Sequence, residues 1–198
     1  MKAEIEAKWL EIDHDEFRGK LKKLGAVQTR ARTEMVRATF DAKDGSLKKK
    51  RGWVRVRDEG DKVTMSYKQV DNTGVDGTKE VSVVVDDFWR AVDFVERLGM
   101  VRKSLQETRR ESWELDGVEI DLDEWPWLPT FVELEAENEE ELKRVAEKLG
   151  LQMEDAMHGS VDYVVVKYYD VTNDEVNSWE EIRFGEVPAW LEAKRRKR

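Results

Sequence analysis

Polar and charged side chains recur two residues apart along this chain, and most of these pairs carry the same charge. At the two-residue period of a β-strand, both members of a pair lie on one face. The opposite face of most of these segments is apolar or aromatic. The pairs are Glu4 and Glu6 (followed by Lys8), Arg55 and Arg57, Ser66 and Lys68, Thr108 and Arg110, Asp121 and Asp123, and Glu133 and Glu135.

An ordinary sheet, with one face in the core and the other in water, is enough to explain the alternation. It does not explain the choice of side chains, because two carboxylates about 7 Å apart on one face repel each other unless a cation lies near them. Paired carboxylates are suitable ligands for Mg²⁺ or Mn²⁺. Arginine and lysine suit phosphate oxygens. Charged faces that line one lumen would therefore fit a phosphate chain bound together with its metal ion.

The composition indicates a folded chain that is not a general nucleic-acid binder. Its 198 residues are long enough to bury a core, and eight tryptophans argue against disorder. The net charge of −9 does not suit a phosphate backbone. There is no cysteine, no GxxxxGK[ST] loop and no apolar run long enough for a bilayer, so we expect a cytoplasmic protein that holds phosphate with side chains.

Three segments have the spacing of amphipathic helices, and each ends in a Leu-Gly pair that predicts a left-handed residue after the last turn. They are residues 13–26, with Asp13 as a predicted N-cap, 86–100 and 138–151. Alternating segments predict about eight strands, which are residues 3–9, 38–40, 53–57, 62–70, 79–85, 107–115, 118–125 and 130–136.

Most of these strands follow one another directly, and Asp58–Asp61 and Asp116–Gly117 are predicted hairpin turns. We therefore predict an α+β fold: an eight-stranded antiparallel closed β-barrel with a polar lumen and with helices packed outside. Residues 1–198 are treated as a single domain, with an appendage from about residue 160 to 198. In that appendage, residues 164–166 are predicted as a strand, and Pro188 as the start of a last helix.

Four motifs, in their order along the chain, resemble the CYTH superfamily of triphosphate tunnel metalloenzymes, which includes class IV adenylyl cyclases, thiamine triphosphatases and inorganic triphosphatases. "EIEAKW" matches the family's ExExK signature, and "FDAKDGSLKKKRGWVRVR" is similar to the stretch that leads into its Arg-x-Arg strand. "MSYKQV" resembles its lysine strand, and "FVELEA" its closing Glu-x-Glu strand. The resemblance covers most of the chain and implies a barrel that binds a triphosphate along its lumen.

The resemblance also implies roles for individual residues. Glu4, Glu6, Glu133 and Glu135 would hold Mg²⁺ or Mn²⁺, assisted by Asp121 and Asp123. Lys8 would lie near the scissile phosphoryl group and, with Arg55 and Arg57, act in catalysis. The remaining substrate-binding candidates are Lys68, Glu80, Arg109 and Arg110.

Two departures from the family pattern bear on the reaction. Where the family has a second Glu-x-Glu, this chain reads Glu80-Val81-Ser82, which puts a second metal position in doubt. Where the family has Lys-x-Arg, it reads Thr108-Arg109-Arg110, so that Arg109 either replaces the missing cation or faces outward.

Three functions remain open at this point. The first hypothesis is metal-dependent hydrolysis of tripolyphosphate or of another triphosphate, such as ATP or thiamine triphosphate. The second is a class IV adenylyl cyclase, which would make cyclic AMP and pyrophosphate from ATP and would need an aromatic pocket for the base; Trp53, Trp113, Trp125 and Trp127 are the candidates, although core packing explains each of them as well. The third is a module that binds polyphosphate or a nucleotide without turnover. We expect no membrane partner and consider a second copy of the chain a candidate partner.

Overall fold

A computed structural model describes the backbone of residues 2–71 and 77–197 and the side chains of these residues from Ile5 onward. Within these residues the strands are β1 (Lys2–Leu10), β2 (Val27–Ala42), β3 (Gly52–Asp58), β4 (Val63–Val70), β5 (Thr78–Val85), β6 (Met100–Leu115), β7 (Val118–Glu124), β8 (Phe131–Ala136) and β9 (Glu181–Ile182). The helices are α1 (His14–Lys23), α2 (Ser46–Lys49), α3 (Phe88–Arg97), α4 (Glu139–Lys148), α5 (Val161–Tyr168), α6 (Asn173–Val176) and α7 (Ala189–Glu192), with a 3₁₀ turn at Met153–Asp155. None of these helices is long and apolar enough to cross a membrane.

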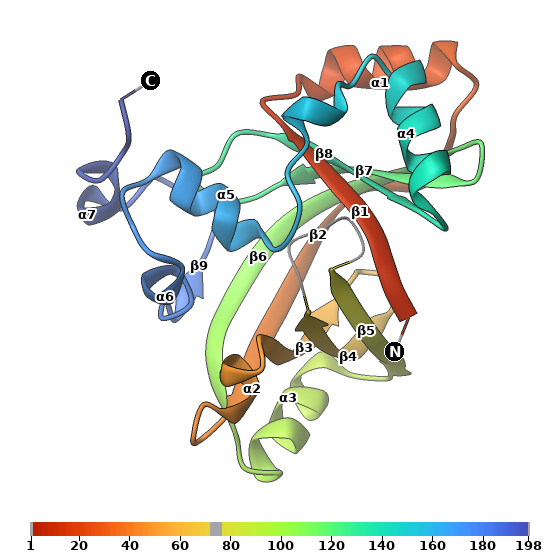
Figure 1. The fold of residues 1–198 in the computed structure, drawn as a ribbon. Coiled ribbons are helices and arrows are strands. Elements are labelled where there is room, and N and C mark those ends of the chain that lie inside the picture. The colour runs from red at the N-terminus through yellow and green to blue at the C-terminus, as the bar shows by residue number, and fades with distance from the viewer. Residues whose placement is uncertain (1, 72–76, 198) are drawn as a thin grey trace.

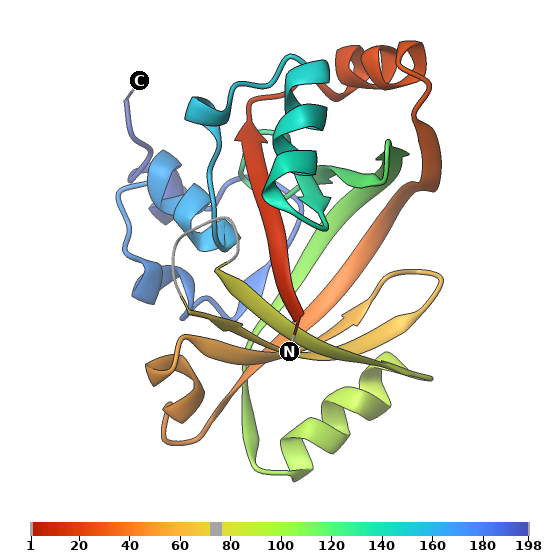
Figure 2. The ribbon, with the colours of Figure 1, turned by 45° about the vertical axis from the view of Figure 1, so that its right-hand side comes forward.

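Eight antiparallel strands form a strongly curled sheet around a central space (Figures 1 and 2). Their hydrogen-bonded order is β2-β3-β4-β5-β1-β8-β7-β6, and the long strands β6 and β2 pair with each other to complete the circuit. The predicted α+β barrel is confirmed, with one correction to its closure. β1 pairs with β5 only from Lys2 to Glu4, and farther along Lys8 pairs with Met157 instead. The barrel is therefore open along part of the seam between β1 and β5.

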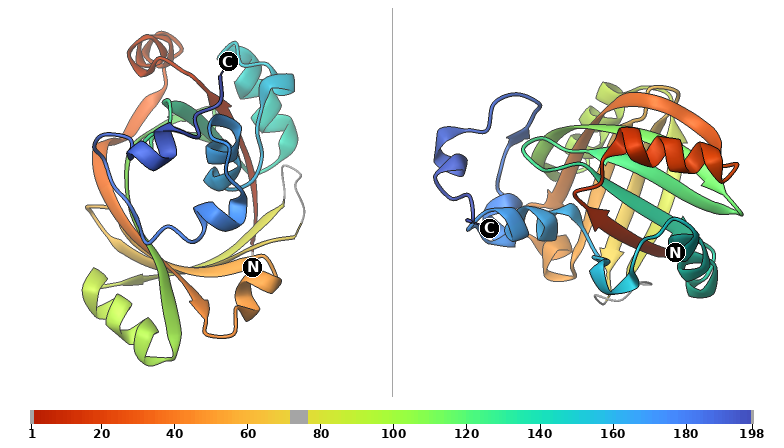
Figure 3. Two further views of the ribbon diagram at one scale, coloured as in Figure 1. Left: turned by 90° about the vertical axis from the view of Figure 1, so that its left-hand side faces the viewer. Right: turned by 90° about the horizontal axis from the view of Figure 1, so that it is seen from above.

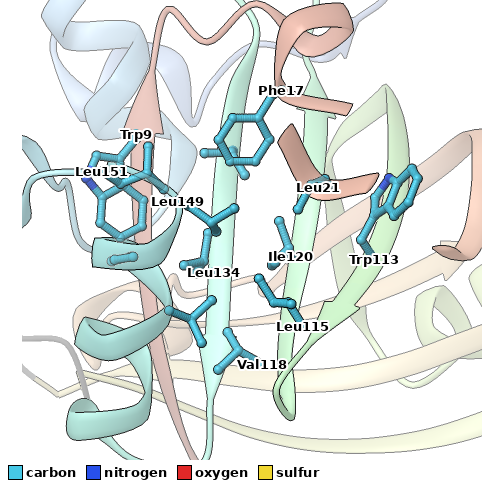
Figure 4. Packing of buried hydrophobic residues seen from close by; sticks show 14 of the residues in the cluster. Trp9, Phe17, Leu21, Trp113, Leu115, Val118, Ile120, Leu134, Leu149 and Leu151 are labelled. Atoms are coloured by element: carbon cyan, nitrogen blue, oxygen red, sulfur yellow. The ribbon is translucent and has the colours of Figure 1, made fainter. Parts of the chain in front are cut away.

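The apolar faces of the strands point outward and are covered by helices. Phe17 and Leu21 of α1 and Leu142 and Val145 of α4 pack on β7, β8 and β1, where Leu134 is fully buried (Figure 4). Burying one such side chain stabilises a fold by roughly 1.5–3 kcal/mol. Alternate side chains of a strand lie on opposite faces. Because the apolar side chains pack in this outer core, the polar side chains of the same strands point into the barrel.

A second cluster lies on the opposite side of the barrel, beneath α3. Phe88, Val92 and Val95 of α3 pack against Val56 of β3 and Ala38 of β2. The three long predicted helices are confirmed, and their start and stop signals act as expected. The N-cap side chains that accept backbone hydrogen bonds are Asp13, Asp87 and Asn138. The left-handed glycines that follow the last turns are Gly25, Gly99 and Gly150.

Strand β2 is much longer than predicted. The sequence pattern indicated only residues 38–40, whereas β2 runs from Val27 to Ala42 and pairs with β6 along most of its length. Its first half is largely exposed and therefore lacks the apolar alternation by which a strand is recognised. The two predicted hairpin turns are confirmed between β3 and β4 and between β6 and β7, where Asp116 and Gly117 have φ of 54° and 82°.

The chain after Gly159 covers one end of the barrel. In the left view of Figure 3 this segment lies in front of the ring of strands, and in the right view it lies at one end of them. β9 pairs in parallel with β6 at Leu105 and Gln106. The segment has a small core of its own, centred on Tyr169 and Leu191, which are fully buried. We call residues 160–193 the cap.

One prediction within the cap is wrong. Val164 to Val166 belong to helix α5 rather than to a strand. Val164 and Val165 are buried in the core of the cap, whereas Val166 is only partly buried, so that a run of β-branched residues serves as one side of a short helix. The last predicted helix, α7, begins after Pro188 as expected.

Candidate functional site

A cavity of about 1850 Å³ runs through the barrel and extends beneath the cap. Its walls are the inward faces of the strands, so the polar pairs that alternate in the sequence meet there. This volume exceeds the roughly 300–1,000 Å³ of ordinary small-molecule pockets.

Carboxylates from three adjacent strands lie side by side on one wall. Glu135 of β8 is the registered partner of Glu6 on β1 and of Glu119 on β7, and all three side chains line the cavity. Burial raises the pKa of Glu135, and the neighbouring charges of Glu133, Glu119 and Glu6 raise it further. We call Glu6, Glu119 and Glu135 the carboxylate row.

Lys8 lies one step along β1 from this row and is paired with two carboxylates. Its Nζ is 2.7 Å from Oε2 of Glu133 and 3.2 Å from Oε1 of Glu6. Burial alone would lower the pKa of Lys8, but the charges of Glu133 and Glu6 outweigh it, and the pKa is raised. Burial would likewise raise the pKa of Glu133, yet Lys8 and Arg110 hold it well below its ordinary value. Lys8 is therefore a fixed positive charge and Glu133 a fixed negative one.

Arg110 of β6 reaches across to the carboxylates of β7. It donates two hydrogen bonds to Asp123, at 2.7 and 2.6 Å, and contacts Asp121. It also lies 3.5 Å from Glu133. Burial raises the pKa of Asp121 to about 8. The charge of Arg110 opposes this rise, and the neighbouring carboxylate of Asp123 adds to it. Three carboxylates therefore share one guanidinium.

Cations dominate the other wall. Arg55 and Lys68 both pair with Glu80, at 3.2 and 3.0 Å. Arg57 donates to Glu59, in the turn between β3 and β4, at 2.8 Å. These side chains come from strands β3, β4 and β5, whose register places Lys68 opposite Glu80.

Arg37 of β2 also lines this wall. Its guanidinium stacks on the Trp125 ring, 3.9 Å from the centroid, and its Nε donates to Oε1 of Gln106 at 2.7 Å. No carboxylate among the described side chains forms an ion pair with it. Burial lowers the pKa of Arg37 well below its ordinary value, and the charges of Arg55, Arg57 and Arg110 lower it further. The field at this point is strongly positive and suits an anion.

The structure brings together most of the predicted site. The predicted residues that line the cavity are Glu6, Lys8, Arg55, Arg57, Lys68, Glu80, Arg110, Asp123, Glu133 and Glu135. Asp121 is buried behind Arg110. Glu4 lies in β1, but its side chain is outside the described part of the structure.

Arg109 was wrongly predicted as a substrate-binding residue. It faces the outside of the barrel, where it pairs with Glu34 at 2.9 Å and stacks on the Phe184 ring. The reason is the strand period: Arg110 points inward, so its neighbour must point outward.

Arg37 and Glu119 are among the lining residues that were missed in the sequence. Arg37 is two residues before Thr39 on the inward face of β2, and the alternation against Ala38 and Phe40 would have identified it had β2 been recognised at its full length. Glu119 is two residues before Asp121 and lies on the same inward face of β7, so the two-residue period also predicts that it lines the cavity.

The carboxylates fit a hard divalent cation. Within residues 5–71 and 77–197 no three acidic or histidine side chains already converge on a single point. Nevertheless, the carboxylate row supplies several oxygen donors side by side, and their repulsion adds to the effect of burial in raising the pKa of Glu135. A cation such as Mg²⁺ or Mn²⁺ would relieve that repulsion.

Comparison with known proteins agrees with this geometry. The family model of the CYTH domain matches residues 2–165. The chain belongs to the CYTH family. Members of this family are triphosphatases or adenylyl cyclases that depend on a divalent metal.

Solved CYTH-like structures share the fold. A Pyrococcus horikoshii protein is 26% identical, with a TM-score of 0.63 over 77% of this chain and 93% of its own. A Vibrio parahaemolyticus protein, named as a candidate adenylate cyclase, is 16% identical. Its TM-score is 0.70, and the match covers 83% of this chain and 98% of that protein. A Hippeastrum protein, named as a candidate adenylyl cyclase with a dominant triphosphatase activity, is 16% identical. Its TM-score is 0.55, and the match covers 83% of this chain and 95% of that protein. A comparison with curated proteins found no match to this chain.

Proposed function

We propose that this protein is a divalent-metal-dependent triphosphatase that cleaves a triphosphate inside the barrel. One observation carries the proposal: Arg37 is a half-buried guanidinium with no ion-pair partner among the described side chains, and three further arginines act on it. A buried charge of this kind is costly unless an opposite charge joins it. A chain of phosphates supplies several negative charges at once.

The two walls of the cavity divide the work. Arg37, Arg55, Arg57 and Lys68 would hold the phosphate oxygens, as guanidinium forks and a point charge. The carboxylate row, with Glu133 and with Glu4, Asp121 and Asp123 as further predicted ligands, would hold the metal. When bound, the metal ion would neutralise phosphate charge and lower the pKa of a water molecule.

Lys8 and Glu135 have distinct roles in this arrangement. Lys8 has a raised pKa and stays charged, so it cannot act as a base; it would stabilise the charge that develops on the transferred phosphoryl group. Glu135 belongs to the carboxylate row, so one of its oxygens would hold the metal and the other would accept a hydrogen bond from water. We propose that its carboxylate orients the attacking water.

A second candidate is the class IV adenylyl cyclase reaction. Trp53, Trp125 and Trp127 line the cavity and offer aromatic surfaces to a base. Trp113, the fourth predicted candidate, packs in the outer core under α1 instead. In this reaction the ribose 3′-hydroxyl of ATP, rather than water, would attack the α-phosphate, and pyrophosphate would leave.

Product analysis separates these functions. Purified protein is incubated with Mg²⁺ or Mn²⁺ and with either tripolyphosphate or ATP, and the products are resolved by anion-exchange chromatography. Orthophosphate with pyrophosphate from tripolyphosphate supports the triphosphatase. Cyclic AMP with pyrophosphate from ATP would replace it with the cyclase. Ligand binding without product would leave a binding module.

Matched variants test the assignment of the acidic wall. Glu133→Gln and Glu135→Gln should each lose metal-dependent turnover by at least about a hundredfold, because a carboxylate ligand or water-orienting group is removed. Glu114→Gln is the control, since Glu114 is an exposed residue of β6 outside the cavity. Circular dichroism checks that each variant is folded. Undiminished turnover in both test variants would refute the assignment.

A further inference from the structure

Strand β5 leaves part of its edge without a neighbouring strand. Its pairing with β1 ends where Lys2 lies opposite Glu80, whereas β5 itself continues to Val85 (Figure 2). From Val81 to Val85 the strand pairs with β4 on one side, and on the other side no described strand is in register with it. These five residues therefore form an open sheet edge within the described part of the chain, and we call them the β5 edge.

The β5 edge is both apolar and exposed. The exposed fraction is 52% for Val81, 51% for Val83 and 70% for Val84. The five residues include no charged residue and no proline. Proteins usually protect an open edge with charges, prolines or a covering segment, because its backbone groups recruit another strand. An open edge without these features is a site for strand pairing.

The sequence around the β5 edge is complementary to itself in charge and in shape. Lys79, Val81, Val83 and Val85 share the outer face of the strand, and Asp87 follows shortly after its end. A second copy that is related by a twofold axis at Val83 runs antiparallel, so Val81 of each copy opposes Val85 of the other. The same axis directs Asp87 of each copy toward Lys79 of the other, and both residues are exposed.

A twofold axis at Val83 also fits the length of the edge. The ladder then runs from Val81 to Val85 and uses all five residues. An axis at Ser82 would push the second strand onto the place that β1 occupies, and an axis at Val84 would shorten the ladder. Because opposed residues of an antiparallel pair share a face, axes between two residues are excluded.

Charges on the inner face do not prevent this pairing. The axis directs Asp86 of each copy toward Glu80 of the other, but the Glu80 carboxylate is already paired with Arg55 and Lys68, at 3.2 and 3.0 Å. The net charge of −9 makes two copies repel each other at long range, and salt of about 0.15 M screens that repulsion beyond about 8 Å.

We propose that two copies of the chain form a homodimer in which their β5 edges pair antiparallel about Val83. The strands of the two barrels would then form one continuous sheet. A ladder of five residues from each copy is a small interface, so we expect a dissociation constant in the range of about 1–100 μM. The proposal does not depend on the proposed triphosphatase function.

Cysteine cross-linking tests the register, because the chain has no cysteine of its own. In the proposed dimer the two Val83 Cα atoms lie about 5 Å apart, within the range that a disulfide can bridge. The two Val84 Cα atoms lie about 8 Å apart, which is beyond that range. Under a mild oxidant, Val83→Cys should therefore form a covalent dimer on a non-reducing gel. Val84→Cys, although more exposed, should cross-link at least about tenfold more slowly.

Sedimentation velocity over a concentration series measures the dimer itself. Val83→Lys places two lysines opposite each other on the axis and should raise the dissociation constant at least about tenfold. Val27→Lys is the matched control, because Val27 is an exposed strand residue with Glu114 as its registered neighbour, and it should leave the constant unchanged. Melting curves show that each variant is folded.

The outcomes decide the proposal. A wild-type dimer that Val83→Lys weakens, together with fast cross-linking of Val83→Cys alone, supports it. A wild type that stays monomeric up to about 200 μM, above the expected dissociation constant, overturns it and leaves the edge to a strand of another protein. A dimer that Val83→Lys does not weaken, or equal cross-linking of the two cysteine variants, overturns it as well.

Discussion

Replacing Arg37 with methionine should stabilise the protein and weaken its binding of triphosphate. Arg37 is half-buried, stacks on Trp125 at 3.9 Å and has no carboxylate partner among the described side chains. Methionine is unbranched and apolar, and it packs well against an aromatic ring. Arg37→Met would thus remove the charge while filling most of the space.

The magnitude follows from the contacts of the guanidinium. Burying an unpaired charge costs several kcal/mol, and the charges of Arg55, Arg57 and Arg110 add to that cost. The stacking returns about 2 kcal/mol, and the hydrogen bond to Gln106 about 1 kcal/mol. We therefore expect Arg37→Met to raise the free energy of unfolding by about 1–2 kcal/mol and Tm by about 2–8 °C. Loss of a charged hydrogen bond to phosphate, at about 1.5–3 kcal/mol, should weaken triphosphate binding about 10- to 150-fold.

The assay measures Tm by thermal melting and tripolyphosphate affinity by calorimetry. Arg109→Met is a matched control, because Arg109 also stacks on an aromatic ring at 3.9 Å but faces outward and is ion-paired with Glu34. We expect it to lower Tm slightly and to leave affinity unchanged. If Arg37→Met lowers Tm and binds tripolyphosphate as tightly as the wild type, Arg37 is a structural residue and the reasoning fails.

Two further predictions concern stability. Burial would raise the pKa of Glu59, but Arg57 and Arg30 lower it from 4.5 to about 2, so its stabilising effect is complete above about pH 4.5 and is lost as the pH falls toward 2. Glu59→Gln should cost about 2 kcal/mol at neutral pH, allowing for nearby solvent, and chemical denaturation at a series of pH values should show the two proteins converging in acid; a constant gap would contradict this. Leu134→Ala, at a fully buried position under α4, should cost about 2–5 kcal/mol in the same assay, and a loss below 1 kcal/mol would show that the outer core does not hold the barrel together.

The sequence was sufficient for the barrel and most of its lining because a single period determines both. Once Val132 and Leu134 are committed to the outer core, Glu133 and Glu135 must face inward. The same rule explains the error at Arg109, which had been retained as a substitute for a missing cation although its neighbour Arg110 already occupied the inward position.

What the sequence did not provide was long-range placement. The first half of β2 is exposed and lacks apolar alternation, so the strand that carries Arg37 was not recognised at its full length. The cap lies against Trp127 and Leu10, which are far from it in sequence, and no local pattern encodes that contact. The run from Val164 to Val166 was misread because β-branched residues favour strands until tertiary packing decides otherwise.

The ion pairs inside the barrel also bear on how metal and substrate bind. Lys8 is held by Glu133 and Glu6, Arg110 by Asp121 and Asp123, and Lys68 by Glu80. A phosphate chain alone must compete with these carboxylates for the cations, and a metal ion alone must compete with the cations for the carboxylates. When both bind, the phosphate chain pairs with the cations that the carboxylates release, and the metal ion pairs with the carboxylates that the cations release. The two should therefore raise each other's affinity by the same factor, because coupling between binding sites is reciprocal. In this arrangement the unpaired charge of Arg37 gives the phosphate chain a contact for which no carboxylate has to be displaced.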